Sequence, residues 1–212
     1  MSAILRQSYL EKIERYLGKD TVIILTGQRR IGKSYILRLF RDKVNKAAGA
    51  NVIFIDKEKH EFDDIKTYKD LNAYIDERRN KAKTNFILVD EIQEIEEFEK
   101  SVRGYYEEPD IEMVVTGSNS KMLSSDLSTL IGGRYKEIYI QSLSYEEFML
   151  FHKLSDSDDT LAKYIQFGGL PGLLKMGLDE QDAREYQLDV YHTVLLKDVI
   201  MRNNIRNVTF LE

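Results

Sequence analysis

The chain has 212 residues, of which 42% are hydrophobic and 32% are charged, values typical of a folded globular protein rather than a disordered one. Its 31 basic and 36 acidic side chains give a net charge of −5, so the overall charge does not favour a protein that coats nucleic acid. The sequence contains no cysteine, which excludes disulfides, thiol nucleophiles and cysteine-based metal sites, and its three histidines have no zinc-ligand spacing.

The first residues, Met1 to Arg6, lack the basic region and apolar core of a signal peptide. The longest apolar runs are only a few residues, whereas a membrane helix needs about twenty. We therefore expect a cytoplasmic protein that makes no contact with a membrane.

Five short segments, bounded by turn residues, are predicted to be strands. Four of them are solid apolar runs, as expected when a parallel sheet is covered on both faces. The five segments are 21–26, 51–56, 86–90, 111–116 and the more polar 136–140. Apolar residues at helical spacing predict helices before and between them, over 7–17, 33–46 and 69–81 and within 94–106. This alternation predicts a doubly wound α/β fold with a mainly parallel five-stranded sheet.

After about residue 150 the strand patterns stop and only helical patterns continue. Ser144 and Glu147 have the spacing of a capping box that opens a helix, and a long helix is predicted over 180–201. We predict an α/β domain over residues 1–150, including an N-terminal helix, and a helical subdomain over 151–212. The last residues carry no helix-terminating signal, which we interpret as the start of a truncated C-terminal region.

The segment that follows the first predicted strand carries a phosphate-binding pattern. It reads Gly27-Gln-Arg-Arg-Ile-Gly-Lys-Ser34, and it lies between a buried strand and a helix, as this pattern requires. Its glycines let backbone N–H groups approach a phosphate, and the helix start adds partial positive charge. We expect Lys33 to contact the β- and γ-phosphates and Ser34 to ligate Mg²⁺. The residues predicted to contact the nucleotide are Gly27, Gln28, Arg29, Arg30, Ile31, Gly32, Lys33, Ser34 and Tyr35.

An acidic pair, Asp90-Glu91, ends the third predicted strand. Ligands of open α/β sheets bind at the carboxyl ends of the strands, which is where this pair is expected. We predict that Asp90 holds the water shell of Mg²⁺ and that Glu91 polarises the attacking water. The alternative is an ordinary acidic cap on the next helix. One strand is inserted between the loop strand and the acidic strand, a pattern that resembles the AAA+, RecA-like and transporter ATPases.

Two further candidates lie near the ends of the fourth and fifth predicted strands. Asn119, or as second choice Ser118, could contact the γ-phosphate or the attacking water, but Gly-Ser-Asn-Ser is also ordinary turn chemistry. Arg134 could reach a phosphate of its own or a neighbouring subunit, as an arginine finger does, or could be an ordinary surface residue.

Together these motifs resemble a large family of bacterial and archaeal AAA-type ATPases, in which the ATPase domain precedes a C-terminal domain of uncharacterised function. The resemblance extends over nearly the whole chain. The segments that carry it are 25–34, 90–93, 116–120, 130–134, 143–148, 168–171 and 197–202. One departure is Ser142, where the family usually has proline before the Leu-Ser pair.

The resemblance implies a P-loop NTPase fold of AAA type that binds ATP rather than GTP and hydrolyses it with Mg²⁺. It also implies a helical subdomain after the sheet, and it favours a functional role for Arg134. Similar proteins continue well past residue 212. A protein partner or DNA would therefore be bound through the missing C-terminal region. Many AAA-type proteins form rings, so an oligomer is possible, but this family need not form one.

We consider three hypotheses for the function. The first is an ATPase that converts ATP to ADP and phosphate and couples this to a conformational change of a C-terminal effector region. The second is an ATP-operated switch or interaction module with little turnover. The third is a kinase for a small acceptor, although the sequence shows no acceptor pocket.

Overall fold

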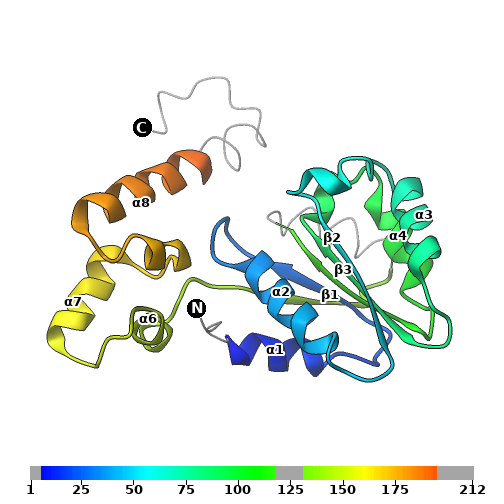
Figure 1. The fold of residues 1–212 in the computed structure, drawn as a ribbon, viewed down its shortest axis with the longest axis horizontal. Helices are drawn as coiled ribbons and strands as arrows, with labels where there is room; N and C mark the ends of the chain where they lie inside the picture. The colour runs from blue at the N-terminus through cyan, green and yellow to red at the C-terminus, as the bar shows by residue number, and fades with distance from the viewer. Residues whose placement is uncertain (1–5, 118–130, 195–212) are drawn as a thin grey trace. The chain divides into compact units, whose positions relative to one another are not determined.

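The computed structural model of the protein describes residues 6–117 and 131–194. Five strands in this part of the chain form one parallel sheet, in the order β2-β3-β4-β1-β5 (Figure 1). The strands are β1 (Val22–Thr26), β2 (Ala50–Asp56), β3 (Thr84–Asp90), β4 (Ile111–Thr116) and β5 (Tyr135–Tyr139). The sheet confirms the predicted α/β fold. Because all its strands run the same way, their carboxyl ends meet at one edge.

The sheet and the helices around it form one compact unit, made of residues 5–27 and 33–140. Helices connect the strands because parallel neighbours need long crossover connections. The helices of this unit are α1 (Gln7–Glu14), α2 (Lys33–Val44), α3 (Tyr68–Arg78) and α4 (Phe98–Tyr105), with two short 3₁₀ turns, η1 (His60–Phe62) and η2 (Ile92–Glu94).

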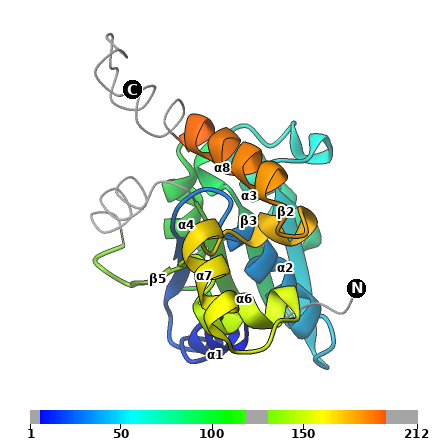
Figure 2. The same ribbon diagram turned by 90° about the vertical axis from the view of Figure 1, so that its left-hand side faces the viewer.

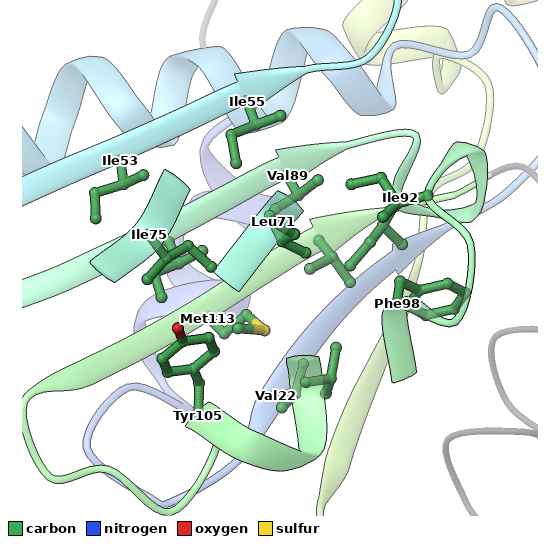
Figure 3. Packing of buried hydrophobic residues seen from close by; sticks show 14 of the residues in the cluster. Val22, Ile53, Ile55, Leu71, Ile75, Val89, Ile92, Phe98, Tyr105 and Met113 are labelled. Atoms are coloured by element: carbon green, nitrogen blue, oxygen red, sulfur yellow. The ribbon is translucent and has the colours of Figure 1, made fainter. Parts of the chain in front are cut away.

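One face of the sheet packs against α3 and α4 (Figure 3). Leu71 and Ile75 of α3 and Phe98 of α4 are buried in this layer. The strands contribute alternate residues, because successive side chains of a strand point to opposite faces. These strand residues are Val22, Ile24, Ile53, Ile55, Ile87, Val89, Met113 and Val115. Each fully buried apolar side chain contributes about 1.5–3 kcal/mol, so this layer fixes the strands whose ends carry the polar residues described below.

The opposite face of the sheet packs against α2. Phe40 of α2 meets Phe86 of β3 edge to face, with ring centroids 6.1 Å apart. Ile36 of α2 is also fully buried. Helix α1 contacts α2 and β5, and it buries Leu10 and Ile13. With helices on both faces, four of the five strands are mainly apolar and β5 is more polar, as the sequence predicted.

The helix predicted within 94–106 is α4, which is separated from the preceding turn. The turn η2 ends at Glu94 and α4 begins at Phe98, and Glu97 between them has a left-handed backbone with φ of 55°. A left-handed residue interrupts an α-helix. Ile95, Phe98 and Val102 keep helical spacing across the break and all three are buried, so the apolar pattern alone does not show at which residue the helix begins.

A second compact unit contains the helices after the sheet, and residues 28–32 of the loop after β1 group with it. These helices are α6 (Tyr145–His152), α7 (Asp158–Phe167) and α8 (Glu180–Val194), with a 3₁₀ turn η3 (Pro171–Lys175) (Figure 2). The capping box predicted at the start of α6 is present: the Ser144 hydroxyl accepts from the Glu147 N–H at 3.2 Å, and the Ser144 N–H donates to the Glu147 carboxylate at 3.0 Å.

Glycine is required in the segment that joins α7 to η3. Gly168 ends α7 in the left-handed region, with φ of 70°. A Cβ on Gly169 would lie 2.3 Å from the carbonyl oxygen of Leu143. The Leu143 N–H donates to the Gly169 carbonyl at 2.7 Å, and this bond holds the two backbones together.

The two compact units divide after Ile140, so α6 groups with the helices that follow it. The limits 1–150 and 151–212 therefore stay a prediction for the domain boundary. Among residues 6–117 and 131–194, no helix has the length and apolar character needed to cross a membrane.

Candidate functional site

The loop after β1 has the backbone that its glycines predict. Gly27 has φ of 136° and Gly32 has φ of 97°, values that glycine adopts without strain. Arg30 between them is also left-handed, with φ of 62°. Alternation of this kind is typical of backbone nests, in which successive N–H groups converge on an anion. Helix α2 begins directly after the loop, so its positive end lies at the same place.

Lys33 is the first residue of α2, and it is buried although it carries a charged group. Its Nζ donates to the carbonyl oxygen of Gly27 at 3.0 Å, across the mouth of the loop. A buried ammonium needs such a partner because desolvation of the charge is costly. The Lys33 side chain is therefore folded back over the loop. Of the remaining loop residues, Ile31 is buried, and Gln28 and Arg30 are exposed.

Four adjacent strands end in buried polar residues. In sheet order these are Asp56 of β2, Asp90 of β3, Thr116 of β4 and Thr26 of β1, and each is at most 1% exposed. Asp56 and Asp90 are also directly paired in the strand register. Buried polar groups are costly unless they are bonded to one another or to a ligand. Their gathering at the carboxyl edge, beside the loop, marks this edge as the candidate site.

Asp90 lies at the centre of this edge. The Thr116 hydroxyl donates to its Oδ1 at 2.5 Å. Its Oδ2 is buried and has no hydrogen-bond partner among the described residues, although Arg38 of α2 has a nitrogen 4.0 Å away. Burial raises the pKa of the Asp90 carboxyl, the hydrogen bond from Thr116 and the nearby Ser34 hydroxyl lower it, and the charge of Asp56 raises it. The structure thus brings Ser34 and Asp90, the two predicted Mg²⁺ ligands, together.

Arg38 brings a positive charge close to the two aspartates. It donates to Asp56 Oδ2 at 3.1 Å and comes within 4.0 Å of Asp90 Oδ2. The Arg38 side chain is 40% exposed, whereas both carboxylates are fully buried. A partly hydrated guanidinium therefore offsets part of the cost of burying two negative charges at adjacent strand ends.

Glu91 follows Asp90 and has a left-handed backbone, with φ of 54°. Its N–H donates to the Thr116 hydroxyl oxygen at 2.9 Å. Its carboxylate accepts from the side-chain amide of Gln93. Hydrogen bonds therefore fix both the backbone N–H and the carboxylate of Glu91. The residue is buried directly after β3.

The residues at this edge fit a magnesium ion bound as Mg²⁺ usually is. Mg²⁺ keeps several waters and takes only one or two protein ligands. Asp90 supplies a buried carboxylate whose Oδ2 has no hydrogen bond to give up, and the Ser34 hydroxyl is near enough to lower the pKa of this carboxyl. Among the described residues, no group of three or more acidic, histidine or cysteine side chains forms a separate metal site.

The structure does not bring Arg134 to this site. Arg134 directly precedes β5, and its carbonyl accepts from the N–H of Val22 at the start of β1. It therefore lies at the amino edge of the sheet, about 17 Å from the loop, since a strand rises about 3.3 Å per residue. Its guanidinium donates to Tyr106 and Glu107 at 2.9 and 2.6 Å. Contact with a phosphate in its own subunit is not supported, and a role in a neighbouring subunit stays a prediction.

Asn119 and Ser118, the predicted contacts to the γ-phosphate or water, lie outside the described residues. The sequence interpretation missed Asp56, Thr116, Arg38 and Gln93. The first two carry a signal in the sequence, because each is the polar residue that ends a solid apolar strand. Arg38 and Gln93 carry no such signal, because their roles depend on partners brought near by folding.

The order 2-3-4-1-5, with a glycine-containing loop after β1 and acidic residues at the end of β3, defines the class: this is a P-loop NTPase fold of the AAA+ type. Comparison with protein families identifies the family to which the chain belongs. Residues 19–149 match the AAA_14 family, described as an AAA domain, and the chain belongs to this family. The resemblance to AAA-type ATPases is thereby confirmed.

Relatives of the chain are longer than it is. An uncharacterised protein of Haemophilus influenzae is 30% identical over 217 residues, which cover 99% of this chain and 54% of that protein. The uncharacterised protein MJ1544 of Methanocaldococcus jannaschii is 28% identical over 92% of this chain and 46% of its own length. The chain spans about half the length of the curated relatives it matches, and it aligns with their N-terminal part.

Solved structures with the same fold include two with a TM-score just above one half. DnaA of Aquifex aeolicus, bound to AMPPCP, has a TM-score of 0.52 at 14% identity, covering 87% of this chain and 68% of that one. A DNA polymerase III gamma subunit-related protein of Thermotoga maritima has a TM-score of 0.53 at 13% identity, covering 80% and 57%. At such identities the likeness concerns the fold alone.

Proposed function

We propose that this chain binds ATP with Mg²⁺ and hydrolyses it to ADP and phosphate. The observation that carries the proposal is the gathering of the buried Asp90 and Glu91 at the carboxyl edge of the sheet, the edge at which the loop and its lysine, Lys33, follow β1. Separate stretches of sequence thus supply phosphate-binding, metal-binding and water-activating groups at one edge of the sheet. Membership of an AAA family supports ATP as the nucleotide.

Each group of the chain has a defined task in the proposed reaction. The loop N–H groups and the start of α2 bind the β- and γ-phosphates, and Lys33 exchanges the Gly27 carbonyl for phosphate oxygens, which bind its charge more strongly. Mg²⁺, held by Ser34 and the water shell on Asp90, neutralises phosphate charge when bound.

Glu91 is the proposed general base. It accepts a proton from a water whose oxygen attacks the γ-phosphorus, while the bond from that phosphorus to the β–γ bridging oxygen breaks and the electrons leave with ADP. The hydrogen bond from Gln93 leaves the second carboxylate oxygen of Glu91 to orient the water. Lys33, Ser34 and Asp90 bind and orient the substrate around this step.

The effector role concerns the full-length protein. Because the relatives are about twice as long, we propose that nucleotide turnover in this part changes the conformation of a C-terminal region. That region would contact a protein partner or DNA. The net charge of −5 gives this part of the protein no general attraction for nucleic acid.

Glu91→Gln tests the proposal and separates it from the switch. The amide keeps the shape of the side chain but cannot accept the proton, and general-base catalysis contributes about 10²–10⁴ in rate. We expect steady-state phosphate release to fall about 100-fold or more while ATP affinity stays within about threefold of wild type. Glu94→Gln, an exposed glutamate in the same turn, is the matched control. Near-zero turnover in wild type and variant, with ATP bound by both, would favour the switch instead.

A further inference from the structure

The hydroxyl of Thr116 is fully committed to the two acidic residues of the neighbouring strand. Its proton is donated to Asp90 Oδ1 at 2.5 Å, and its oxygen accepts the Glu91 N–H at 2.9 Å. The Thr116 residue is 0% exposed, so no bulk water competes for either bond. A buried hydroxyl that donates one hydrogen bond and accepts another fixes the positions of the two groups relative to each other.

We propose that Thr116 is a positioning residue that sets the proposed metal ligand Asp90 and the proposed base Glu91 relative to each other; this inference rests on the proposed function. Its place in the sheet explains why this residue can do so. Strand β4 lies between β3, which carries the acids, and β1, which leads into the loop. A side chain at its end therefore reaches the acids without crossing another strand.

The bond to Asp90 determines which carboxylate oxygen is available. Thr116 occupies Oδ1, and Oδ2 is the oxygen that has no hydrogen bond among the described residues. Without the hydroxyl, the Asp90 carboxylate could rotate about its terminal torsion, which is broad for this side chain. Thr116 thus holds Oδ2 in one direction, ready for the water shell of a bound metal.

The bond to Glu91 holds the backbone of the base. A residue with a side chain rarely adopts a left-handed φ such as the 54° of Glu91, and it does so only where its surroundings hold it. The Thr116 oxygen is the partner of the Glu91 N–H at this bend. Gln93 holds the opposite end, since its amide donates to the Glu91 carboxylate. Thr116 therefore touches both acids, whereas Gln93 touches only one.

Variants of Thr116 and Gln93 can therefore separate loss of the contact to Asp90 from loss of a contact to Glu91. Thr116→Val keeps the shape of the side chain and removes the hydroxyl, and Thr116→Ser keeps the hydroxyl. Gln93→Ala removes only the contact to Glu91. Ser101→Ala removes a fully buried hydroxyl on α4 that donates to the Tyr68 carbonyl at 3.1 Å, and it serves as the matched control.

The experiment measures binding of a fluorescent ATP analogue with and without Mg²⁺, together with steady-state turnover and a thermal unfolding curve for each variant. The readout specific to positioning is the Mg²⁺ enhancement, the ratio of the two affinities. For Thr116→Val we expect Mg²⁺-free affinity within about threefold of wild type, and losses of about tenfold or more in Mg²⁺ enhancement and in turnover, as when a hydrogen bond to a charged group is removed. If this variant fails to fold, Thr116→Ala provides the same comparison.

The other variants have distinct expected results. Thr116→Ser retains Mg²⁺ enhancement within about threefold, and Gln93→Ala lowers turnover but retains the enhancement, since Asp90 is untouched. Wild-type enhancement in Thr116→Val, or an equal loss in Ser101→Ala, would overturn the positioning role while leaving the proposed function standing. A wild-type protein that binds no nucleotide would instead overturn the proposed function, and this inference with it.

Discussion

Asp90 occupies a position that disfavours its own charge. Desolvation raises the pKa of its carboxyl, and the negative charges of Asp56 and Glu91 raise it further. The hydrogen bond from Thr116 and the nearby Ser34 hydroxyl oppose this shift without cancelling it. Sites that bind charged ligands commonly reduce the folding stability of the free protein, because the arrangement that suits the ligand is not the most stable one.

Asp90→Asn is therefore expected to stabilise the free protein. Between the ordinary pKa of about 3.9 and the raised folded-state pKa, the folded protein holds a proton that the unfolded chain has released. The stability contributed by Asp90 is thus present at low pH and is lost as the pH rises through this window. The asparagine carries no charge, so it suffers no such loss.

Urea unfolding of wild type and Asp90→Asn from about pH 3 to pH 8, with a chelator present, checks this sign. The variant should be the more stable at pH 7, and the difference should shrink towards pH 3. Asp64→Asn, at an exposed position, is the control. A wild-type protein that gains stability relative to Asp90→Asn as the pH rises would contradict the assigned environment.

The site could be predicted only in part from the sequence. The loop and the acidic pair were found because their residues are close in the chain, where spacing is fixed. Thr116 and Asp56 were missed, because their partners lie on other strands and a polar residue before a glycine or a lysine resembles ordinary turn chemistry. At the end of the fourth strand, Asn119 was preferred, but it lies outside the described residues, whereas Thr116 makes the contacts that are seen.

At the scale of the elements, the end of α3 is tied to the start of β4 by an arginine. Arg79 donates to Asp110 at 2.9 Å through Nε, and to Glu108 at 2.6 Å. Its side chain is 12% exposed, and its pKa is raised first by the hydrogen bond to Asp110 and then by the one to Glu108. These contacts lie at the amino edge of the sheet, opposite the candidate site.

Arg79→Met should therefore reduce stability without affecting the nucleotide. Removing the cation leaves the partly buried Asp110 with its hydrogen bond from Asn85 but without a positive charge beside it. We expect a loss of about 2 kcal/mol, less than for a fully buried pair, because both acidic partners are partly exposed. Chemical denaturation measures this loss, and ATP affinity should be unchanged. Arg103→Met, at an exposed position on α4, should change stability little. Equal stability of the two variants would contradict a structural role for this arginine.

The ends of helices and strands were predicted well where burial determines them. They were predicted poorly where the backbone conformation of a single residue determines them. Strands β1 and β4 are buried on both faces almost throughout, where apolar side chains fit, and this made them easy to find; β5 is more polar and less buried. The break between η2 and α4 was missed, because the left-handed conformation of Glu97 does not follow from its residue type. Apolar spacing continued across that break, so periodicity alone could not reveal it.

At the scale of the whole molecule, the chain contains two compact units and matches about half of its relatives' length. The sheet unit carries Lys33, Asp90, Glu91 and Thr116, whereas residues 28–32 of the loop group with the helical unit. The helical unit and the part of the relatives beyond this chain are the candidates for passing nucleotide turnover to an effector. A segment that binds ATP yet hydrolyses it slowly, beside a longer version that turns over faster, would fit that coupling.

The central claim is that the loop after β1 binds the triphosphate of ATP, and calorimetric titration of ATP with Mg²⁺ into wild type and Lys33→Ala tests it most directly. Loss of a charged hydrogen bond corresponds to about 1.5–3 kcal/mol, so we predict a fall in affinity of about tenfold to a hundredfold. Lys46→Ala, at an exposed position beyond α2, should bind ATP as wild type does. Equal affinities of Lys33→Ala and wild type, or a wild type that binds no ATP, would contradict the account.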